Sequence, residues 1–452
     1  MTDMKYKFSR FFHMFEREGI VCCYNALTIS TIYIPCMEFD KIKAYIAGNN
    51  AEYNDAIFHK MLSENMIIPY DTDEELLLEK IRSEVFNGVK IRVMVLHMTD
   101  YCNLRCKYCF IEGGQPENYT RKTMSEDVAK AAVDKFVEIV RRGHVENNAP
   151  TVVFYGGEPL ANWNVLQKIL EYIQKKEEEE KIKFDKVIIT NGTLIEPGMT
   201  DVLKKFGVMV SVSLDGVQEV HDANRIDYDG KGSFEKTING IKVLQAAGIE
   251  PAVSCVMAKE GIDKYEETIR FLIEDLSITG MGFNHVSIIP GLNYYDPEYE
   301  EKFADSIIKV QELIQYKYPY VYERRMGHKV NAFIDKKLIK SDCTGCGEQI
   351  SVSTDGQIGI CQGYMGSRKT FTHTVFDLNY YPDEDETFIE WSRRSPLNIE
   401  ECTYCSALAI CGGGCPRNAD MLHGSIWNVD SAFCHFARKA QEWLLWEDIY
   451  ER

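Results

Sequence analysis

The stretch Thr99-Asp-Tyr-Cys102-Asn-Leu-Arg-Cys106-Lys-Tyr-Cys109-Phe110 directly follows an apolar run, Ile91–Met98, which is typical of a buried strand. Three thiolates on one loop can hold three irons of a cubane [4Fe–4S] cluster and leave the fourth iron without a protein ligand. A structural zinc site would need four ligands in two pairs, and no fourth ligand is near in the sequence. The C-x3-C-x2-C spacing therefore favours Cys102, Cys106 and Cys109 as ligands of a cluster with one open iron.

Beyond this loop, apolar runs alternate with amphipathic stretches such as Ser125–Arg142 and Val165–Lys181. Six strand–helix units predict a parallel sheet, either doubly wound or closed into a full or partial barrel. Functional residues are expected where such strands end. The expected strands are Ile91–Met98, Thr151–Tyr155, Lys186–Thr190, Val208–Leu214, Glu250–Met257 and Phe283–Ile289.

Polar motifs follow three of these strands. Two glycines allow a close backbone approach to a ligand, and a neighbouring carboxylate can accept an ammonium group. An arginine fork matches a carboxylate, although a tight turn and a surface salt bridge are the structural alternatives. The motifs are Tyr155-Gly156-Gly157-Glu158-Pro159, Thr190-Asn191-Gly192, and Ser211-Val-Ser213-Leu-Asp215-Gly216 followed by Arg225.

The cysteine spacing, with Tyr108 before the last cysteine and Gly-Gly-Glu-Pro one strand–helix unit later, resembles the radical S-adenosylmethionine (radical SAM) enzymes. The resemblance implies an α/β fold with a partial (β/α)6 barrel. It implies that a reduced cluster on Cys102, Cys106 and Cys109 cleaves SAM to methionine and a 5′-deoxyadenosyl radical, which abstracts a substrate hydrogen. The SAM contacts it implies are Tyr108 at the adenine, Gly156, Gly157, Glu158 and Pro159 at the amino group, Asn191 at the same rim, Ser213 at the ribose, Asp215 as a second ribose contact or a turn residue, and Arg225 at the carboxylate.

Eight further cysteines stand near the C-terminus, enough for two four-thiolate clusters, with two zinc knuckles as the alternative. A hairpin with Asp355-Gly356 at its turn is expected to lead to Cys361. The set resembles the SPASM extension of radical SAM enzymes that modify peptides and proteins. The resemblance implies three [4Fe–4S] clusters in all, the first auxiliary one on Cys343, Cys346, Cys361 and Cys415 and the second on Cys402, Cys405, Cys411 and Cys434.

Residues 1–88 carry no catalytic motif. Ile20–Ile34 predicts two short strands with a turn near Asn25, and helical patterns follow at Phe39–Ile46 and Asp55–Asn65. The pattern resembles small winged-helix-like modules that bind a leader peptide by strand addition, with a structural cap as the equal alternative. The expected domains are this module at 1–88, a radical SAM core at 89–291, a bridging helical region at 292–340 and a SPASM domain at 341–452.

Composition limits the partners and the compartment. The chain has 452 residues, a formal net charge of −18 and 15 cysteines. The charge opposes nucleic-acid binding, and neither a signal peptide nor a membrane span is present, so a cytoplasmic protein is expected. Many cysteines in a reducing compartment indicate metal sites rather than disulfides.

Gln362 stands directly after the hairpin cysteine, where the resembling anaerobic sulfatase maturases carry an aspartate that accepts a proton. An amide cannot act as that base. We therefore expect a peptide maturase of the sactipeptide or ranthipeptide type that forms a cysteine thioether. A carbon–carbon or carbon–oxygen link is the alternative, formylglycine formation is less favoured, and an electron-carrying scaffold is the non-enzymatic reading. The implied partners are a precursor peptide with a leader and a flavodoxin- or ferredoxin-type electron donor.

Overall fold

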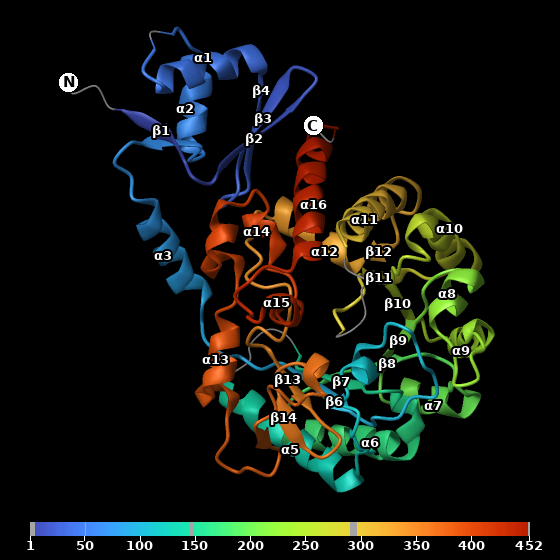
Figure 1. Cartoon of the computed structure of the whole chain (residues 1–452). Helices are drawn as coiled ribbons and strands as arrows, with labels where there is room; N and C mark the ends of the chain where they lie inside the picture. The colour runs from blue at the N-terminus through green and yellow to red at the C-terminus, as the bar shows by residue number, and fades with distance from the viewer. Residues whose placement is uncertain (1–4, 50, 144–148, 290–295, 451–452) are drawn as a thin grey trace.

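One sheet contains strands that lie between Val93 and Thr374 of the chain (Figure 1). The computed structural model describes residues 5–49, 51–143, 149–289 and 296–450. Among these residues ten strands are paired in the order β12-β11-β10-β9-β8-β7-β6-β13-β14-β15. Their bounds are β6 Val93–His97, β7 Thr151–Tyr155, β8 Asp185–Thr190, β9 Val208–Ser213, β10 Ala252–Val256, β11 Gly280–Asn284, β12 Tyr322–Glu323, β13 Gln349–Val352, β14 Gln357–Gly359 and β15 His373–Thr374.

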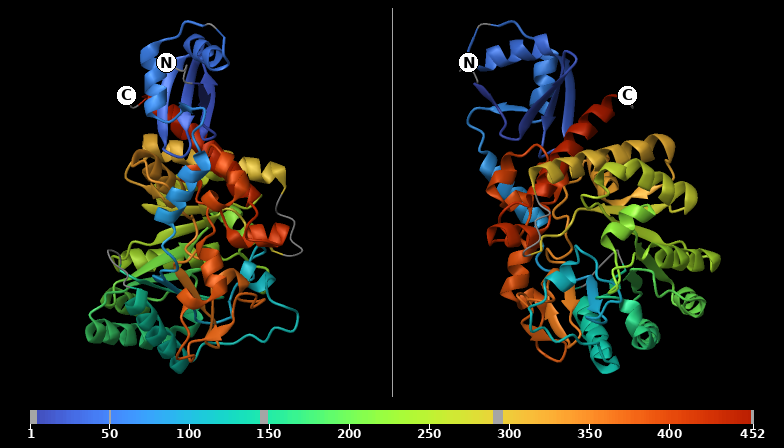
Figure 2. Two further views of the ribbon diagram at one scale, coloured as in Figure 1. Left: turned by 90° about the vertical axis from the view of Figure 1, so that its left-hand side faces the viewer. Right: turned by 45° about the vertical axis from the view of Figure 1, so that its right-hand side comes forward.

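Strands β6 to β11 lie side by side in chain order and all run parallel. A doubly wound sheet would reverse its strand order at a switch point, and this sheet does not. The intervening helices lie along the outer side of a curved sheet (Figures 1 and 2). The structure is therefore a partial barrel, as predicted. These helices are α5 Glu126–Gly143, α6 Trp163–Glu180, α7 Pro197–Lys205, α8 Gln218–Asn224, α9 Phe234–Ala246 and α10 Tyr265–Arg270.

Alternate residues of the strands face opposite sides of the barrel wall. In β10, Val253 and Cys255 are buried in the core, whereas Ser254 between them is only partly buried. Ser254 is in register with Ser213 of β9 and with Gly282 of β11. The inner face of these strands is therefore made of small or polar side chains.

Five of the six predicted strands are present within two residues of their expected bounds, but the sixth was misplaced. The prediction was Phe283–Ile289, whereas β11 is Gly280–Asn284. Gly280 and Gly282 lower the local hydrophobicity of the true strand and make it difficult to recognise. Val286 and Ile289 are buried although they lie outside any strand.

The C-terminal hairpin extends the barrel sheet, which the sequence analysis had not anticipated. β13 pairs in parallel with β6, from Gln349 beside Val93 to Val352 beside Leu96. β14 then returns antiparallel after the predicted turn, where Gly356 has a φ of +84°. The remaining C-terminal helices are α11 Pro297–Lys317, α12 Arg324–Ile334, α13 Glu386–Ser392, α14 Leu408–Cys411, α15 Pro416–His423 and α16 Ser431–Tyr450.

The N-terminal module contains the two predicted strands and also β1, β2 and β5, which were missed. The face of β3 that carries Val21 and Cys23 belongs to the module's own core. The opposite face, with Cys22 and Tyr24, joins the main core, and the Tyr24 hydroxyl lies 3.2 Å from Oε1 of Gln441 in α16. Figure 2 shows the module seated beside that helix. The elements are β1 Tyr6–Phe8, β2 Phe12–Arg17, β3 Ile20–Asn25, β4 Ser30–Pro35, α1 Cys36–Ile46, α2 Asp55–Ser63, β5 Ile67–Pro69 and α3 Glu74–Val85.

The predicted domain boundary at 291 falls outside the described residues, and the other two boundaries stay predictions. Among the described residues, no helix combines the length and the apolar composition that crossing a bilayer requires.

Candidate functional site

The cysteine loop joins β6 to α4 (Phe110–Gly113) at the carboxyl edge of the sheet. Burial raises the pKa of Cys102 to about 12 and that of Cys106 to about 11, and the neighbouring thiols of the loop add to both shifts. The Leu104 N–H lies 3.4 Å from the sulfur of Cys102, and the Glu112 N–H lies 3.4 Å from the sulfur of Cys109. Such amide donors stabilise thiolates that ligate an iron–sulfur cluster.

Backbone hydrogen bonds hold the loop on the segment that follows α8. The Arg105 N–H donates to the Ile226 carbonyl at 2.6 Å, and the Lys107 N–H donates to the Asn224 carbonyl at 3.0 Å. Because these bonds involve only the backbone, they position the loop without using its cysteine side chains.

Gly156 and Gly157 allow the Gly-Gly-Glu-Pro turn to lie directly against the cysteine loop. A Cβ atom on Gly156 would lie 2.5 Å from the Thr99 carbonyl oxygen, and one on Gly157 would lie 2.3 Å from the Tyr101 carbonyl oxygen. The Gly157 N–H donates to the Thr99 oxygen at 2.8 Å. In the structure these glycines let the turn approach the cysteine loop. The sequence analysis had instead expected them to let the backbone approach a ligand.

Glu158 is fully buried and joins the ends of two strands. Its carboxylate accepts hydrogen bonds from the Leu160 N–H at 3.0 Å, the Thr190 hydroxyl at 2.7 Å and the Asn191 N–H at 2.8 Å. Burial raises its pKa to about 6. Pro159 begins the short helix η1 (Pro159–Asn162) that follows. Contact of Glu158 with the amino group of SAM remains a prediction, and the carboxylate also has this structural role.

Asn191, at the end of β8, reaches the cysteine loop. Its amide Nδ2 donates to Oδ1 of Asn103 at 2.9 Å and lies 3.7 Å from the sulfur of Cys102. A polar residue predicted for the SAM rim therefore also contacts a predicted ligand.

Asp215 and Arg225 form a buried ion pair with each other. Nε and Nη2 of Arg225 donate to the two carboxylate oxygens at 2.9 and 3.1 Å, and the Tyr108 hydroxyl also donates to Asp215. The guanidinium lies 5.4 Å from the Tyr108 ring centroid, and Tyr108 is only 7% exposed. Burial alone would lower the pKa of Arg225, but Asp215 holds it well above its usual value. Only the hydrogens of Arg225 that Asp215 leaves are available to a SAM carboxylate.

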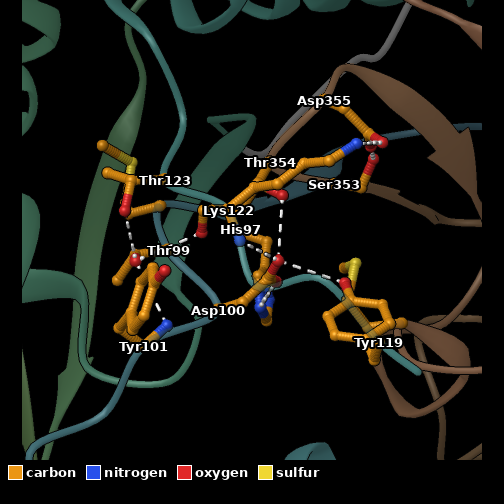
Figure 3. A network of polar contacts seen from close by, with 12 residues as sticks. His97, Thr99, Asp100, Tyr101, Tyr119, Lys122, Thr123, Ser353, Thr354 and Asp355 are labelled. Atoms are coloured by element: carbon orange, nitrogen blue, oxygen red, sulfur yellow. Dashed lines mark hydrogen bonds and ion pairs between the residues drawn. The ribbon is translucent and has the colours of Figure 1, made fainter. Parts of the chain in front are cut away.

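Sequence analysis missed the network around Asp100 (Figure 3). Oδ2 of Asp100 accepts hydrogen bonds from the Lys122 N–H, the Tyr119 hydroxyl and the Thr354 hydroxyl at 3.0, 3.1 and 3.2 Å. Nε2 of His97 lies 3.2 Å from Oδ1. Burial would raise the pKa of Asp100, but these partners hold it below its usual value. The network joins the cysteine loop to the C-terminal hairpin, and an acidic residue two positions after an apolar run was the signal for it.

The C-terminal cysteines gather in two sets of four. In the first set, each of the four thiols acts on the pKa of another member. In the second set, burial together with Cys411 and Cys405 raises the pKa of Cys402, and burial together with Cys411 and Cys402 raises that of Cys434. Cys405 also lies near Arg438 and raises the pKa of that guanidinium. The structure thus brings together the members of each predicted set, while their role as ligands stays a prediction. The sets are Cys343, Cys346, Cys361 and Cys415, and Cys402, Cys405, Cys411 and Cys434.

Thiols with backbone N–H groups directed at their sulfurs are a donor set that suits iron–sulfur clusters. Among the described residues, no three Cys, His, Asp or Glu side chains converge on a point that a single metal ion could occupy. A zinc ion would need its sulfurs about 2.3 Å from the metal, whereas a cubane cluster separates its ligand sulfurs further. The N–H groups of Gly363 and Gly413 lie 3.3 Å from the sulfurs of Cys361 and Cys411.

Two buried cations hold the C-terminal loops. Arg394, with no exposed surface, donates to the Gly413 carbonyl at 2.6 Å. Lys329 is equally buried and donates to the Cys411 carbonyl at 2.7 Å and to the Asp342 carboxylate at 2.8 Å. Their positive charges favour thiolate clusters at this end of the molecule.

Gln362 is held in place by a second amide. Its Oε1 accepts a hydrogen bond from Nε2 of Gln349 at 3.0 Å, and that Nε2 also donates to the Ile360 carbonyl at 2.9 Å. The residue after the hairpin cysteine is therefore a neutral amide whose oxygen is already hydrogen-bonded to Gln349.

The sequence profile of the Radical SAM superfamily matches residues 96–272. The radical SAM cyclopropyl synthase TigE of Paramaledivibacter caminithermalis is 26% identical over 413 residues, which are 85% of this chain and 81% of TigE. Among solved structures, native anSMEcpe with bound AdoMet has a TM-score of 0.66 at 21% identity, over 79% of this chain and 98% of that one. Streptococcus suis SuiB bound to its precursor peptide SuiA has a TM-score of 0.56 at 16% identity, over 94% and 99%. The two structures show that the fold is shared.

Proposed function

Because this chain is a radical SAM enzyme, we propose that it matures a ribosomally made peptide by joining a cysteine sulfur to a carbon of an acceptor residue. When bound, the clusters supply the electron that cleaves SAM and accept the electron that product formation releases. The acceptor carbon loses a hydrogen atom to the 5′-deoxyadenosyl group, and the cysteine loses a proton. The peptide therefore loses two hydrogens, and SAM leaves as methionine and 5′-deoxyadenosine.

The site residues have named roles in this proposal. Cys102, Cys106 and Cys109 hold the cluster that binds SAM, and the two sets of four C-terminal cysteines hold the auxiliary clusters. Ser213 meets the ribose, and Arg225 meets the carboxylate with the hydrogens that Asp215 leaves. Tyr108 supports this arrangement through its hydroxyl on Asp215. The support is that the cysteine loop, Ser213 and Arg225 all lie at or beyond the carboxyl ends of strands in one parallel sheet, where barrel enzymes bind their ligands.

A peptide substrate is supported from two directions. In the described part of the chain, the outer edges of β2 and β4 pair with no further strand, so either edge can accept a peptide as an added strand. SuiB, whose fold this chain shares, has been solved with a precursor peptide. We propose that a leader segment binds the N-terminal module while the core of the peptide enters the barrel, and that a flavodoxin- or ferredoxin-type protein supplies electrons.

The observation that carries cross-linking over formylglycine formation is the Gln349–Gln362 amide pair. An aldehyde-forming maturase needs a base at the position of Gln362, and a hydrogen-bonded amide cannot take up a proton near neutral pH. Cross-linking needs no base on the protein at that position, because the proton lost from the cysteine can leave from the substrate.

A carbon–carbon link is the second candidate. It is supported by the similarity to TigE, which is described as a cyclopropyl synthase and matches most of this chain, because closing a cyclopropyl ring forms a carbon–carbon bond. The same hydrogen abstraction also allows a carbon–oxygen link. In both cases every cysteine of the peptide would keep its thiol.

The test uses the anaerobically reconstituted enzyme, SAM, a reductant and the short peptide encoded beside this gene. We expect a product two hydrogens lighter, with one cysteine per cross-link protected from iodoacetamide and no adduct with a hydrazide. Tandem mass spectrometry then locates the bond. The same mass loss with every cysteine still alkylated would replace the thioether by the carbon–carbon or carbon–oxygen link. A hydrazide adduct would identify a formylglycine-forming enzyme.

A further inference from the structure

A cavity of about 730 Å³ opens between β11, α12 and the segment 337–344 that leads to the C-terminal hairpin. Gly282 and Asn284 line it from the inner face of the barrel. Cys343, from the first auxiliary set, lines it from the other side. The cavity thus extends from the barrel interior to that set.

The lining of this cavity is cationic although the whole chain is strongly acidic, with a net charge of −18. Five lysines and arginines line it against three carboxylates. The cations are Arg92, Arg324, Arg325, Lys337 and Lys340, and the carboxylates are Asp335, Asp342 and Glu348.

Each of the three carboxylates is already neutralised. Asp335 lies 3.2 Å from Lys337, and Glu348 lies 2.7 Å from Arg92. Asp342 lies 2.8 Å from Lys329, a cation outside the lining.

Three cations of the lining therefore have no carboxylate in direct contact. In the part of the chain that the structure describes, Arg324, Arg325 and Lys340 form no ion pair. Lys340 instead lies 5.4 Å from the Phe86 ring centroid, at the end of the N-terminal module. The cavity thus offers three cations that no carboxylate contacts directly, although Asp342 and Glu348 act on Arg325 and Lys340 through space.

Arg325 is held in a fixed orientation. Its Nε donates to the Phe283 carbonyl at 2.7 Å, and its Nη2 donates to Oδ1 of Asn284 at 2.8 Å. Among the described residues Nη1 has no hydrogen-bonding partner, and Nη2 keeps a second hydrogen. These remaining donors match a carboxylate as a two-pronged fork.

Arg325 is also connected to the predicted SAM site. Nδ2 of Asn284 lies 3.2 Å from the Ser254 hydroxyl, and Ser254 is in register with Ser213, the predicted ribose contact. Neighbouring strands lie about 4.8 Å apart, so β9 and β11 are separated by about 10 Å. A carboxylate on Arg325 would therefore lie within about three residues of a peptide group that reacts beside the ribose.

We propose that Arg325, assisted by Arg324 and Lys340, is a carboxylate subsite for an aspartate or glutamate of the peptide substrate, within about three residues of the acceptor residue. The proposal rests on the peptide-maturase function proposed above. Continuity of the cavity with the inner barrel face favours a peptide segment over an acidic redox protein, which would dock on an outer surface.

Two labelled decapeptides of alternating glycine and either Asp/Glu or Asn/Gln test the subsite by fluorescence anisotropy on reconstituted enzyme with SAM. We expect the acidic peptide to bind at least about tenfold more tightly at low salt, and Arg325→Gln to abolish the difference. Arg325→Lys keeps the charge but not the fork, so an intermediate preference is expected. Lys337→Gln is the matched control, because it removes a cation of the same cavity that Asp335 already neutralises, and it should leave the preference unchanged.

Two results would overturn the subsite: equal binding of both peptides by the unaltered enzyme, or an equal loss of preference in Lys337→Gln. Unchanged peptide preference in Arg325→Gln, with loss of flavodoxin-driven SAM cleavage, would assign the cavity to the electron donor instead. If Arg325→Gln does not retain its iron, the double variant Arg324→Gln/Lys340→Gln replaces it and should weaken the preference, while full retention counts against the subsite. Binding needs no turnover, so a preference without any mass loss would reject only the proposed function.

Discussion

The guanidinium of Arg225 holds the carboxylate of Asp215 through two hydrogen bonds, at the point where β9 ends and the barrel opens. Both side chains are at most 9% exposed. Asp215 also accepts the Val256 N–H at 3.0 Å, which joins β9 to β10. The pair is therefore part of the barrel wall as well as of the predicted SAM site.

Removing the charge of Asp215 should be costly, because it leaves Arg225 charged and buried without its partner. We expect Asp215→Asn to lower the free energy of unfolding of the apoprotein by about 3–5 kcal/mol. Arg270→Gln, which breaks an exposed pair with Glu266, should cost less than about 1 kcal/mol. Urea unfolding measures both values. A loss below about 1 kcal/mol for Asp215→Asn would show that the pair contributes little.

Gly157→Ala should displace the cysteine loop, because its Cβ would lie 2.3 Å from the Tyr101 carbonyl oxygen. We expect loss of about four irons per chain and of SAM cleavage, with the folded structure retained. Gly198→Ala is the matched control, since its Cβ would meet no atom within 4 Å. Iron analysis and 5′-deoxyadenosine formation provide the measurements, and normal values for Gly157→Ala would contradict the proposed close packing.

The reconstituted protein should contain about twelve irons, from three four-iron clusters. Replacing Cys102, Cys106 and Cys109 together by alanine should leave about eight irons and abolish SAM cleavage. Cys36→Ser, which changes a cysteine outside all three sets, should alter neither. Continued cleavage of SAM by the triple variant would reject the catalytic cluster.

His221 should make the apoprotein less stable in acid. Burial lowers its pKa to about 4, and its Nε2 lies 2.9 Å from the Ser233 hydroxyl. In the unfolded chain the pKa of His221 is about 6.5. Between about pH 4 and 6.5 this side chain therefore binds a proton in the unfolded chain but not in the folded one. Stability is thus complete above about pH 6.5 and falls by up to about 3 kcal/mol as the pH approaches 4.

Urea unfolding between pH 7.5 and 4.5 tests this dependence, and His221→Gln should flatten it. An identical pH profile in His221→Gln would assign the acid loss to other groups.

Leader binding should be visible as slower amide exchange at one edge of the N-terminal sheet. Deleting residues 1–88 is a poor test, because Cys22 and Tyr24 are packed in the main core and their removal would expose it. Hydrogen–deuterium exchange of the intact enzyme, with and without the full-length peptide, avoids that problem. We expect protection in β2 or β4, and unchanged exchange in both would reduce the module to a structural cap.

Much of the barrel could be predicted because it depends on local patterns. Apolar runs of strand length mark β6 to β10, and the periodicity of α5 and α6 marks their outer helices. The cysteine loop is equally local, since the three predicted ligands lie within eight residues of chain. The glycines of β11 weakened that pattern, and this strand was misplaced for that reason.

Only the tertiary structure decided which groups meet across distant segments. It paired Asp215 with Arg225, placed Gly157 against Tyr101, and added β13 beside β6. It also placed Arg325 in a cavity that no motif marks. Such contacts depend on which surfaces are buried together when the chain folds, and residue spacing carries no information about that. Sequence alone therefore determined the kind of chemistry, while the packing of the barrel decided which side chains are free to serve it.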